Sequence, residues 1–185
     1  MLLDRYGQVA ADGSYTSPID NETRRFFTML GTLVRGRVRV GGSAAAATKV
    51  ALDIAVSYGD VRRQFTAPDR DREVVVNDYL AHQRKLLPAL ATTYALHFAQ
   101  EELVTELHEV FGGDSENDQR KRELESQAAG LKAVATWHAT RTIQECREAC
   151  GGAGYLAVNR FAALKADTDV FTLSLIHISE PTRRS

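Results

Sequence analysis

LESQAAGLKAVATWHATRTIQECREACGGAGY, residues 124–155, combines a long apolar repeat with a glycine-rich end. Small or apolar residues recur through it at helical spacing, at Leu124, Ala128, Leu131, Ala135, Ile143, Cys146 and Cys150. Because residues three or four positions apart share one face of an α-helix, this repeat predicts a long helix with one buried face. The glycines at 151 and 152 predict its end, since glycine commonly follows the last helical turn.

Three segments outside this stretch also favour helix. Two are long, at about residues 21–58 and 79–110, and one is short, at about 159–167. A helix of roughly 30 residues is about 45 Å long, and short connections between such helices favour antiparallel neighbours. The sequence therefore predicts an all-α fold in which the long helices form an antiparallel bundle.

Three features interrupt the helical pattern. Gly41 and Gly42 lie inside the first long segment and predict a kink or a tight contact with another helix, because glycine is unfavourable in a helix interior. Pro88 predicts a kink in the second segment, since proline lacks the backbone N–H that a helix uses. Pro68 and the four charged residues after it predict a loop between the two segments.

The composition argues against several classes of protein. The 23 basic and 24 acidic residues leave a net charge of −1, so no long-range field attracts nucleic acid or anionic lipid. We therefore expect neither a nucleic-acid nor a membrane partner. The N-terminus lacks a signal peptide, so a cytoplasmic location is expected, or a peroxisomal one if the source is eukaryotic. Cys146 and Cys150 fit small buried side chains in a reducing compartment better than a disulfide framework.

Common metal and nucleotide sites do not fit this sequence, and no metal ligand is predicted. A di-iron bundle needs Glu-x-x-His, but the residues three before His82, His97, His108 and His138 are Tyr79, Tyr94, Thr105 and Ala135. The two cysteines have no second Cys/His pair at zinc-ligand spacing. Neither a Walker loop nor a Gly-x-Gly-x-x-Gly turn is present.

Two short motifs are candidates for ligand binding. In Arg62-Arg63-Gln64-Phe65 a guanidinium could bind phosphate through two parallel hydrogen bonds, although solvated surface charge is the ordinary interpretation of an arginine pair. In Gly151-Gly152-Ala153-Gly154 bare backbone could approach a ligand closely, although a helix-ending turn is the ordinary interpretation of such glycines. Neither motif alone decides between its two interpretations.

Taken together, the two motifs resemble a known family. YGDVRRQF at 58–65 is similar to a segment of the acyl-CoA dehydrogenase and oxidase superfamily, and CREACGGAGYL at 146–156 is similar to its acyl-CoA oxidase branch. The resemblance extends from about residue 1 to 172. It implies a four-helix bundle like the C-terminal FAD-binding domain of these enzymes, from a homo-oligomer whose FAD site is shared between subunits.

The resemblance also implies roles for individual residues. Contacts with FAD are implied for Arg62, Gln64, Phe65, Gly151, Gly152 and Gly154, and a contact with acyl-CoA is implied for Arg37. The sequence departs from the family pattern at Val34, where dehydrogenases carry Asp, and at Glu148, where they often carry Gln. A carboxylate near a pyrophosphate would be repelled, so the cofactor contact on that side is in question.

The implied reaction converts a fatty acyl-CoA to a trans-2-enoyl-CoA and reduces O2 to H2O2. We expect residues 1–18 to be the end of a β-domain and a linker, and 19–172 to be a truncated helical domain. Residues 173–185 resemble translated sequencing adapter and are expected to be non-native. This tail replaces the segment that carries the family's catalytic glutamate, so no catalytic residue is expected and the fragment should be inactive. The alternatives are an acyl-CoA dehydrogenase and a non-catalytic helical scaffold.

Overall fold

A computed structural model describes residues 6–69, 71–112 and 118–173 of the 185-residue chain. The chain forms two compact units, Met1–Gly36 and Arg37–Ser185. The second unit contains both motifs and the helical core.

The first unit begins with a small antiparallel hairpin. Strands β1 (Gln8–Val9) and β2 (Tyr15–Thr16) pair across a turn in which Gly13 has a φ of 84°. Only glycine adopts such a positive φ without steric cost. Helix α1 (Glu22–Leu30) follows, and the Asn21 side chain accepts a hydrogen bond of 2.9 Å from the backbone N–H of Arg24, as N-cap residues do.

Helix α2 (Thr32–Val61) runs without interruption through the two glycines that predict a break. The helical segment is broken earlier, by a turn at Gly31. The side chain of Gln100 lies against both glycines. A Cβ atom added at Gly41 would lie 3.0 Å from Oε1 of Gln100, and one added at Gly42 would lie 3.4 Å from Nε2 of Gln100. Gly41 and Gly42 therefore do not interrupt the helix, and of the two expectations for them the tight contact with another helix is present.

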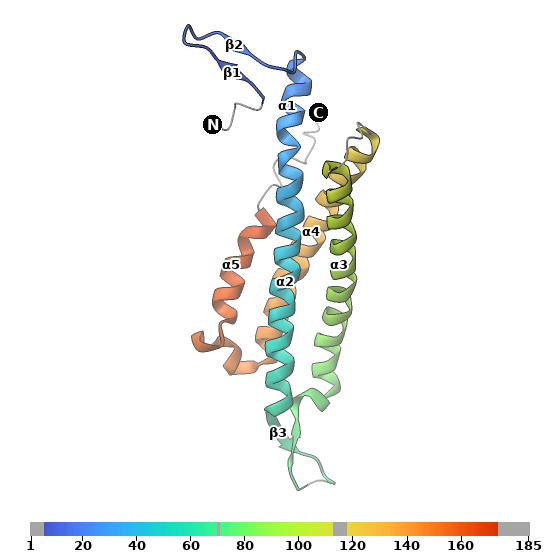
Figure 1. Ribbon diagram of the computed structural model, residues 1–185. Coiled ribbons are helices and arrows are strands. Elements are labelled where there is room, and N and C mark those ends of the chain that lie inside the picture. The colour runs from blue at the N-terminus through green and yellow to red at the C-terminus, as the bar shows by residue number, and fades with distance from the viewer. Residues whose placement is uncertain (1–5, 70, 113–117, 174–185) are drawn as a thin grey trace, which may run out of the picture. The chain divides into compact units, whose positions relative to one another are not determined.

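The second unit is an antiparallel bundle of four helices. After α2 come α3 (Leu80–Gly112), α4 (Asp118–Ala149) and α5 (Phe161–Leu173), and successive helices alternate in direction (Figure 1). Helix α3 continues across Pro88. The predicted all-α fold and the antiparallel four-helix bundle are confirmed, although α5 ends six residues beyond its predicted end and the first predicted helix is divided into α1 and α2. Within the described ranges, no helix is both long and apolar enough to cross a membrane.

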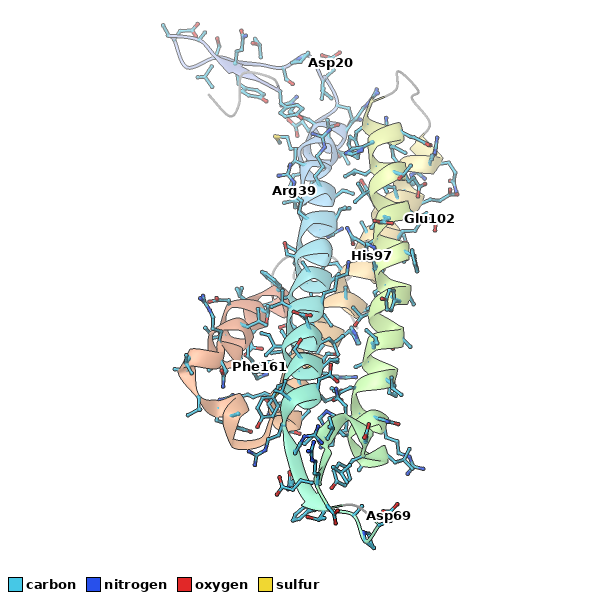
Figure 2. The ribbon with its side chains drawn as sticks, turned by 60° about the horizontal axis from the view of Figure 1, so that its bottom comes forward. Asp20, Arg39, Asp69, His97, Glu102 and Phe161 are labelled. Atoms are coloured by element: carbon cyan, nitrogen blue, oxygen red, sulfur yellow. The ribbon has the colours of Figure 1, made fainter. Side chains whose placement is uncertain are left out.

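Small side chains dominate the contact between helices in the second unit. The core combines alanines of α2, α3 and α4 with a few larger residues, and Phe161 from the start of α5 lies beside α2 (Figure 2). Its buried members are Ala44, Ala47, Ala51, Leu52, Ala55, Leu86, Ala89, Ala135, Ala139, Ile143, Cys146, Cys150 and Phe161. Alanine stripes let helix axes approach closely, so the register between the helices is tightly constrained.

The expected loop between the first two long helices contains a second hairpin. Strands β3 (Arg63–Thr66) and β4 (Glu73–Val75) pair antiparallel, and a 3-10 turn, η1 (Val76–Asp78), leads into α3. The sequence signal for these strands was weak, because each has only three or four residues and all residues of β3 are exposed. Period-two apolar alternation therefore could not reveal them.

A partly buried imidazole joins α3 to α4. His138 Nε2 lies 2.9 Å from Thr93 Oγ1, and that hydroxyl donates to the carbonyl of Ala89 at 2.7 Å. The hydroxyl proton is thus already used, so Nε2 of His138 carries a proton and donates to Thr93. Burial lowers the pKa of His138 below its ordinary value, and a backbone hydrogen bond with Ala89 partly opposes this. The folded protein therefore favours the neutral imidazole.

We expect this imidazole to make the fold sensitive to acid. Because its pKa is lower in the folded state, the unfolded state takes up the proton first as the pH falls below about 6.5, and stability is lost in that range. Burial lowers the pKa of His82 in the same direction. Urea unfolding between about pH 7.5 and 5.5 should give a falling midpoint for the wild-type chain and a flatter profile for His138→Gln. Parallel profiles for the two proteins would contradict this assignment.

Candidate functional site

The β3–β4 hairpin is anchored to the end of α2 by one asparagine. Asn77 Nδ2 donates to the carbonyl of Val56 at 3.0 Å and to Asp60 Oδ1 at 2.7 Å. A Cβ added at Gly59 would lie only 1.9 Å from Asn77 Oδ1, so a side chain at position 59 would displace the asparagine. Glycine at this position allows the hairpin to close against the helix.

Further hydrogen bonds fix the base of the hairpin. The Tyr79 hydroxyl donates to the carbonyl of Gln64 at 2.5 Å, and the backbone N–H of Val76 donates to the carbonyl of Arg62 at 2.8 Å. Gln83 in the first turn of α3 donates to the carbonyl of Asn77 at 2.9 Å. The backbone around the predicted site residues is therefore held from both adjoining helices.

Phe65 adopts a backbone conformation that bulky residues rarely take. Its φ is 57°, at an irregularity in the strand pairing between Gln64 and Thr66, and its side chain is 69% exposed. A left-handed conformation at an aromatic residue is strained and persists only where the surroundings impose it. Packing in this unit does not explain the strain, because the ring is largely exposed. Strain of this kind is typical of a functional position.

The two adjacent arginines differ in their contacts. Arg63 Nη1 donates to the backbone carbonyl of Glu73 across the hairpin at 3.0 Å. The guanidinium of Arg62 is exposed and makes no hydrogen bond or ion pair with another described residue. Arg62 can therefore offer its full set of donors to a ligand, whereas Arg63 supports the hairpin.

The glycine turn after α4 contains two kinds of glycine. The turn is a 3-10 segment, η2 (Gly151–Tyr155), in which Gly151 has a φ of 57°. Gly151 and Gly152 are exposed, and an added Cβ at either would meet nothing within 4 Å. Gly154 is buried, and a Cβ there would lie 2.0 Å from the backbone carbonyl oxygen of Arg147. Gly154 is thus required for packing, while the first two glycines leave backbone open on the surface.

Side chains on both sides hold this turn in place. The Arg147 guanidinium lies 4.1 Å from the centre of the Tyr155 ring, close enough for a cation–π contact. Asn159, in the 3-10 turn η3 (Ala157–Asn159), donates to the carbonyl of Ala153 at 2.7 Å. The exposed backbone of the turn is consequently supported from α4 and from η3.

The bundle brings the two motifs to one end. Because α2 and α4 run in the same direction, the hairpin after α2 and the glycine turn after α4 lie at the same end of the second unit (Figure 1). Arg37 belongs near the other end of α2, about 37 Å from Arg62 at 1.5 Å per residue. The structure therefore places six of the seven predicted site residues at one end and separates Arg37 from them.

Lys132 was missed by the sequence reasoning. It is 4% exposed, and its Nζ lies 3.4 Å from the carbonyl of Thr172 near the end of α5. Lys132 follows Ala128 by four positions and precedes Ala135 by three, so it falls on the apolar face of its helix. A lysine at such a position was the available signal, because a buried ammonium group needs a specific partner.

An open pocket of about 430 Å³ lies between α2 and α3. Lys49 Nζ lies 3.0 Å from Nδ1 of His97, and His97 Nε2 lies 3.4 Å from Glu101 Oε1, so a short polar chain lies at its edge. The lining comprises Lys49, Leu52, Asp53, Val56, Leu90, Thr93, Tyr94 and His97. None of the predicted site residues lines this pocket.

The cysteines are buried and free, as predicted. Burial, and then the neighbouring Cys150 and Glu145, raise the pKa of Cys146 to about 12. Burial also raises the pKa of Cys150. Because the thiolate is the reactive form, neither side chain is suited to nucleophilic chemistry.

Comparison with known proteins assigns this architecture to a family. Residues 30–173 match the family model described as the acyl-CoA oxidase C-alpha1 domain. The chain belongs to the acyl-CoA oxidase family. It is 41% identical over 170 residues to acyl-coenzyme A oxidase 2, peroxisomal, of Arabidopsis thaliana, covering 92% of the chain and 24% of the relative. It is 40% identical over 174 residues to human peroxisomal acyl-coenzyme A oxidase 3, with 91% and 25% covered.

A solved structure agrees with this assignment. An acyl-CoA oxidase from tomato superposes with a TM-score of 0.77 at 33% identity, covering 92% of this chain and 25% of the tomato chain. The chain thus spans about a quarter of the length of these acyl-CoA oxidases. The matched range includes Arg37, the hairpin and the glycine turn.

The contrast between the glycines can be tested by alanine substitution. Gly154→Ala should lower the free energy of unfolding by about 2 to 4 kcal/mol, because its methyl group would meet backbone that cannot move aside easily. Gly152→Ala is the matched control and should change stability by less than about 0.5 kcal/mol. The measurement is urea unfolding of both variants, followed by circular dichroism. Equal effects at the two positions would show that the turn is packed differently.

Proposed function

We propose that this chain is part of an enzyme that oxidises fatty acyl-CoA to trans-2-enoyl-CoA and reduces O2 to H2O2, with FAD as cofactor. Relatives that match nearly the whole chain are acyl-CoA oxidases, and one solved relative, from Caenorhabditis elegans, is described as complexed with FAD and ATP. The observation that carries the proposal is the presence, at one end of the bundle, of exposed glycine backbone, a strained aromatic residue and an exposed arginine that pairs with no described residue.

These residues fit a dinucleotide. The exposed guanidinium of Arg62 suits a phosphate group, since it can donate two parallel hydrogen bonds. Gly151 and Gly152 leave room for the backbone to approach a ligand closely, because nothing lies where their side chains would be. Gln64 and Phe65 offer an amide and an exposed ring on the same hairpin. When bound, FAD would accept the electrons removed from the acyl chain.

Gly154 contributes to this site through packing. Its backbone lies against the carbonyl of Arg147, so we assign it to the support of Gly151 and Gly152 as well as to the proposed cofactor surface. Glu148 lies on the same final turns of α4 and is exposed, and Gln144 donates to its Oε1 at 2.9 Å. This hydrogen bond ties the carboxylate to its own helix.

The separation of Arg37 from Arg62 supports a shared site. If Arg37 contacts acyl-CoA and Arg62 contacts FAD, the reacting parts of both ligands must meet, although the two arginines are about 37 Å apart on one helix. A second copy of the chain could bring its own hairpin end close to Arg37. We therefore propose a homo-oligomer in which one subunit supplies the Arg37 side and the other supplies the Arg62 side.

We further propose a peroxisomal location, because the curated relatives are named as peroxisomal enzymes. For the domains, we retain residues 1–18 as the end of a β-domain with its linker, 19–172 as the helical domain, and 173–185 as a non-native tail. Residues 174–185 lie outside the described part of the chain. No observation favours a dehydrogenase or a scaffold over an oxidase.

If residues 173–185 are a non-native tail, their removal should have only a small effect on the stability of the fold. Deleting residues 173–185 should change the free energy of unfolding by less than about 0.5 kcal/mol, as for changes away from packed features. The urea midpoints of the full chain and the shortened chain measure this directly when the unfolding free energies of both depend equally on urea concentration. A clear drop on deletion would show that these residues belong to the fold.

The proposed activity requires the complete enzyme. We expect the 185-residue chain to produce no peroxide from palmitoyl-CoA with added FAD, because it spans about a quarter of its relatives. A protein expressed from the complete coding region should release peroxide and the enoyl product in equal amounts. Electron transfer to an artificial acceptor without peroxide formation would instead identify a dehydrogenase.

The two arginines of the hairpin provide a matched test of the cofactor surface. In the complete enzyme, Arg62→Ala should weaken FAD retention by roughly tenfold to a hundredfold, since a hydrogen bond to a charged group is worth about 1.5 to 3 kcal/mol. Arg62→Lys should restore only part of the loss, because lysine cannot bind in the same two-pronged way. Flavin fluorescence after dilution reports the dissociation.

Arg63→Ala is the control for this experiment. Arg63 donates to Glu73 within the hairpin, so its loss should affect local stability more than FAD retention. Equal losses of FAD in the two alanine variants would indicate a diffuse electrostatic effect and exclude a specific contact at Arg62.

A further inference from the structure

Phe65 is the extra residue of a β-bulge. Strand β3 pairs Gln64 with Val74, and its next paired residue is Thr66, which lies opposite Glu73. Phe65 itself therefore has no partner on β4, and its φ is 57°. Glycine is the usual residue at a left-handed position in a bulge, because it has no side chain. Here the position carries an aromatic ring that is 69% exposed, so the bulge presents this ring outside the core.

The peptide group before Phe65 is held by a tyrosine at the start of α3. This peptide group contains the carbonyl of Gln64 and the N–H of Phe65, and the Tyr79 hydroxyl donates to that carbonyl at 2.5 Å. Because a peptide group is planar, turning the carbonyl changes ψ of Gln64 and φ of Phe65 together. A hydrogen bond that fixes the carbonyl therefore also fixes φ of Phe65.

The backbone of Tyr79 is in turn fixed by α3. Tyr79 directly precedes the helix, and its φ of −76° and ψ of 126° are the extended conformation of a residue at the N-cap position. Its carbonyl accepts hydrogen bonds of 3.0 Å from the backbone N–H groups of both His82 and Gln83. Its own N–H donates to the carbonyl of Val76 at 3.2 Å. The phenol thus reaches β3 from a helix end whose position the bundle determines.

The same short segment is also joined to the end of α2. Asn77 donates to the carbonyl of Val56 at 3.0 Å and to a carboxylate of the same helix at 2.7 Å. The backbone N–H of Val76 donates to the carbonyl of Arg62 at 2.8 Å. All four residues of β3 are exposed, so this support does not serve the apolar core. Rigid support of an exposed strand is expected where the strand presents side chains to a ligand.

We propose that Tyr79 is a positioning residue for the cofactor surface. Its hydroxyl fixes the peptide between Gln64 and Phe65, and this holds the Phe65 ring in its binding orientation before the cofactor arrives. A ring that is already ordered loses little freedom on binding, which strengthens the binding. Tyr79 acts through Phe65 and not by its own contact with the ligand. The identity of the ligand, FAD, rests on the proposed function.

Tyr79→Phe removes only the hydroxyl and tests the geometry without flavin. In the isotopically labelled 185-residue chain, NMR measures the nuclear Overhauser signal between the amide proton and Hα of Phe65, which is strong when φ is positive. We expect a strong signal in the wild-type chain and a weaker one in Tyr79→Phe. Tyr94→Phe is the matched control and should leave the signal unchanged, because the exposed Tyr94 hydroxyl has no hydrogen-bond partner in the described ranges.

Phe65→Gly gives an independent measure of the strain. Glycine takes a positive φ at little cost, so this substitution should raise the urea midpoint of the wild-type chain. It should raise the midpoint less in the Tyr79→Phe background, since the peptide is then free to relax. If Tyr79→Phe does not fold, as judged by circular dichroism, Phe65→Gly alone remains informative. A midpoint that falls in the wild-type background would contradict the imposed strain.

The link to the cofactor is measured in the complete enzyme by flavin fluorescence after dilution. Tyr79→Phe should speed FAD dissociation by about threefold to tenfold, the effect of losing one hydrogen bond to a backbone carbonyl. Tyr94→Phe should leave the dissociation unchanged. Excess FAD should restore the rate of peroxide release by Tyr79→Phe, because Tyr79 positions another residue and touches no reacting group.

Three results would overturn the proposal. An unchanged Phe65 signal in Tyr79→Phe would show that other contacts impose the left-handed conformation. A weaker signal with unchanged FAD dissociation would show that the conformation of Phe65 does not govern cofactor binding. Equal acceleration by Tyr79→Phe and Tyr94→Phe would show a general loss of stability. The proposed function fails by a different result, namely a wild-type complete enzyme that retains no FAD or releases no peroxide.

Discussion

Close contact between alanine-rich helix faces is the constraint on which the second unit depends. Alanines of α2, α3 and α4 form most of the shared core, and Phe161 and Ile143 are its large fully buried members. Small side chains leave little freedom for one helix to slide along another, since a shift would place side chains against backbone. The ends of the helices are therefore fixed relative to each other. Both candidate motifs begin where a helix of this core ends.

Glycine performs three different tasks around that core. Gly41 and Gly42 allow Gln100 to pack against α2, Gly59 and Gly154 allow a neighbouring group to lie against backbone, and Gly151 adopts a positive φ. Sequence spacing cannot distinguish these roles, because the same residue type serves in all three. At Gly41 and Gly42 the sequence left a kink and a tight contact as alternatives, and in the structure the side chain of Gln100 fills the space beside both glycines.

The sequence predicted the long helices well because each buries a continuous apolar face. Leu124, Ala128, Ala135 and Ile143 share one face, and all four are buried. The hairpin at 63–75 could not be predicted in the same way, because hydrogen bonds from Asn77 and Tyr79 hold it rather than an apolar repeat. Such bonds join residues about 15 to 20 positions apart, which a local pattern does not encode. The resemblance identified Arg62 and Phe65, and not Arg63, as candidates, and the structure adds that Arg63 donates a hydrogen bond within the hairpin.

The placement of charge follows from the same packing. An exposed arginine such as Arg62 costs little to leave unpaired, because water solvates it, and it can exchange that water for a ligand. Lys132 is in the opposite situation, since the helices that bury it remove water from its ammonium and supply one long hydrogen bond in exchange. The carbonyl of Thr172 offsets this desolvation only in part, so burial lowers the pKa of Lys132 below its ordinary value.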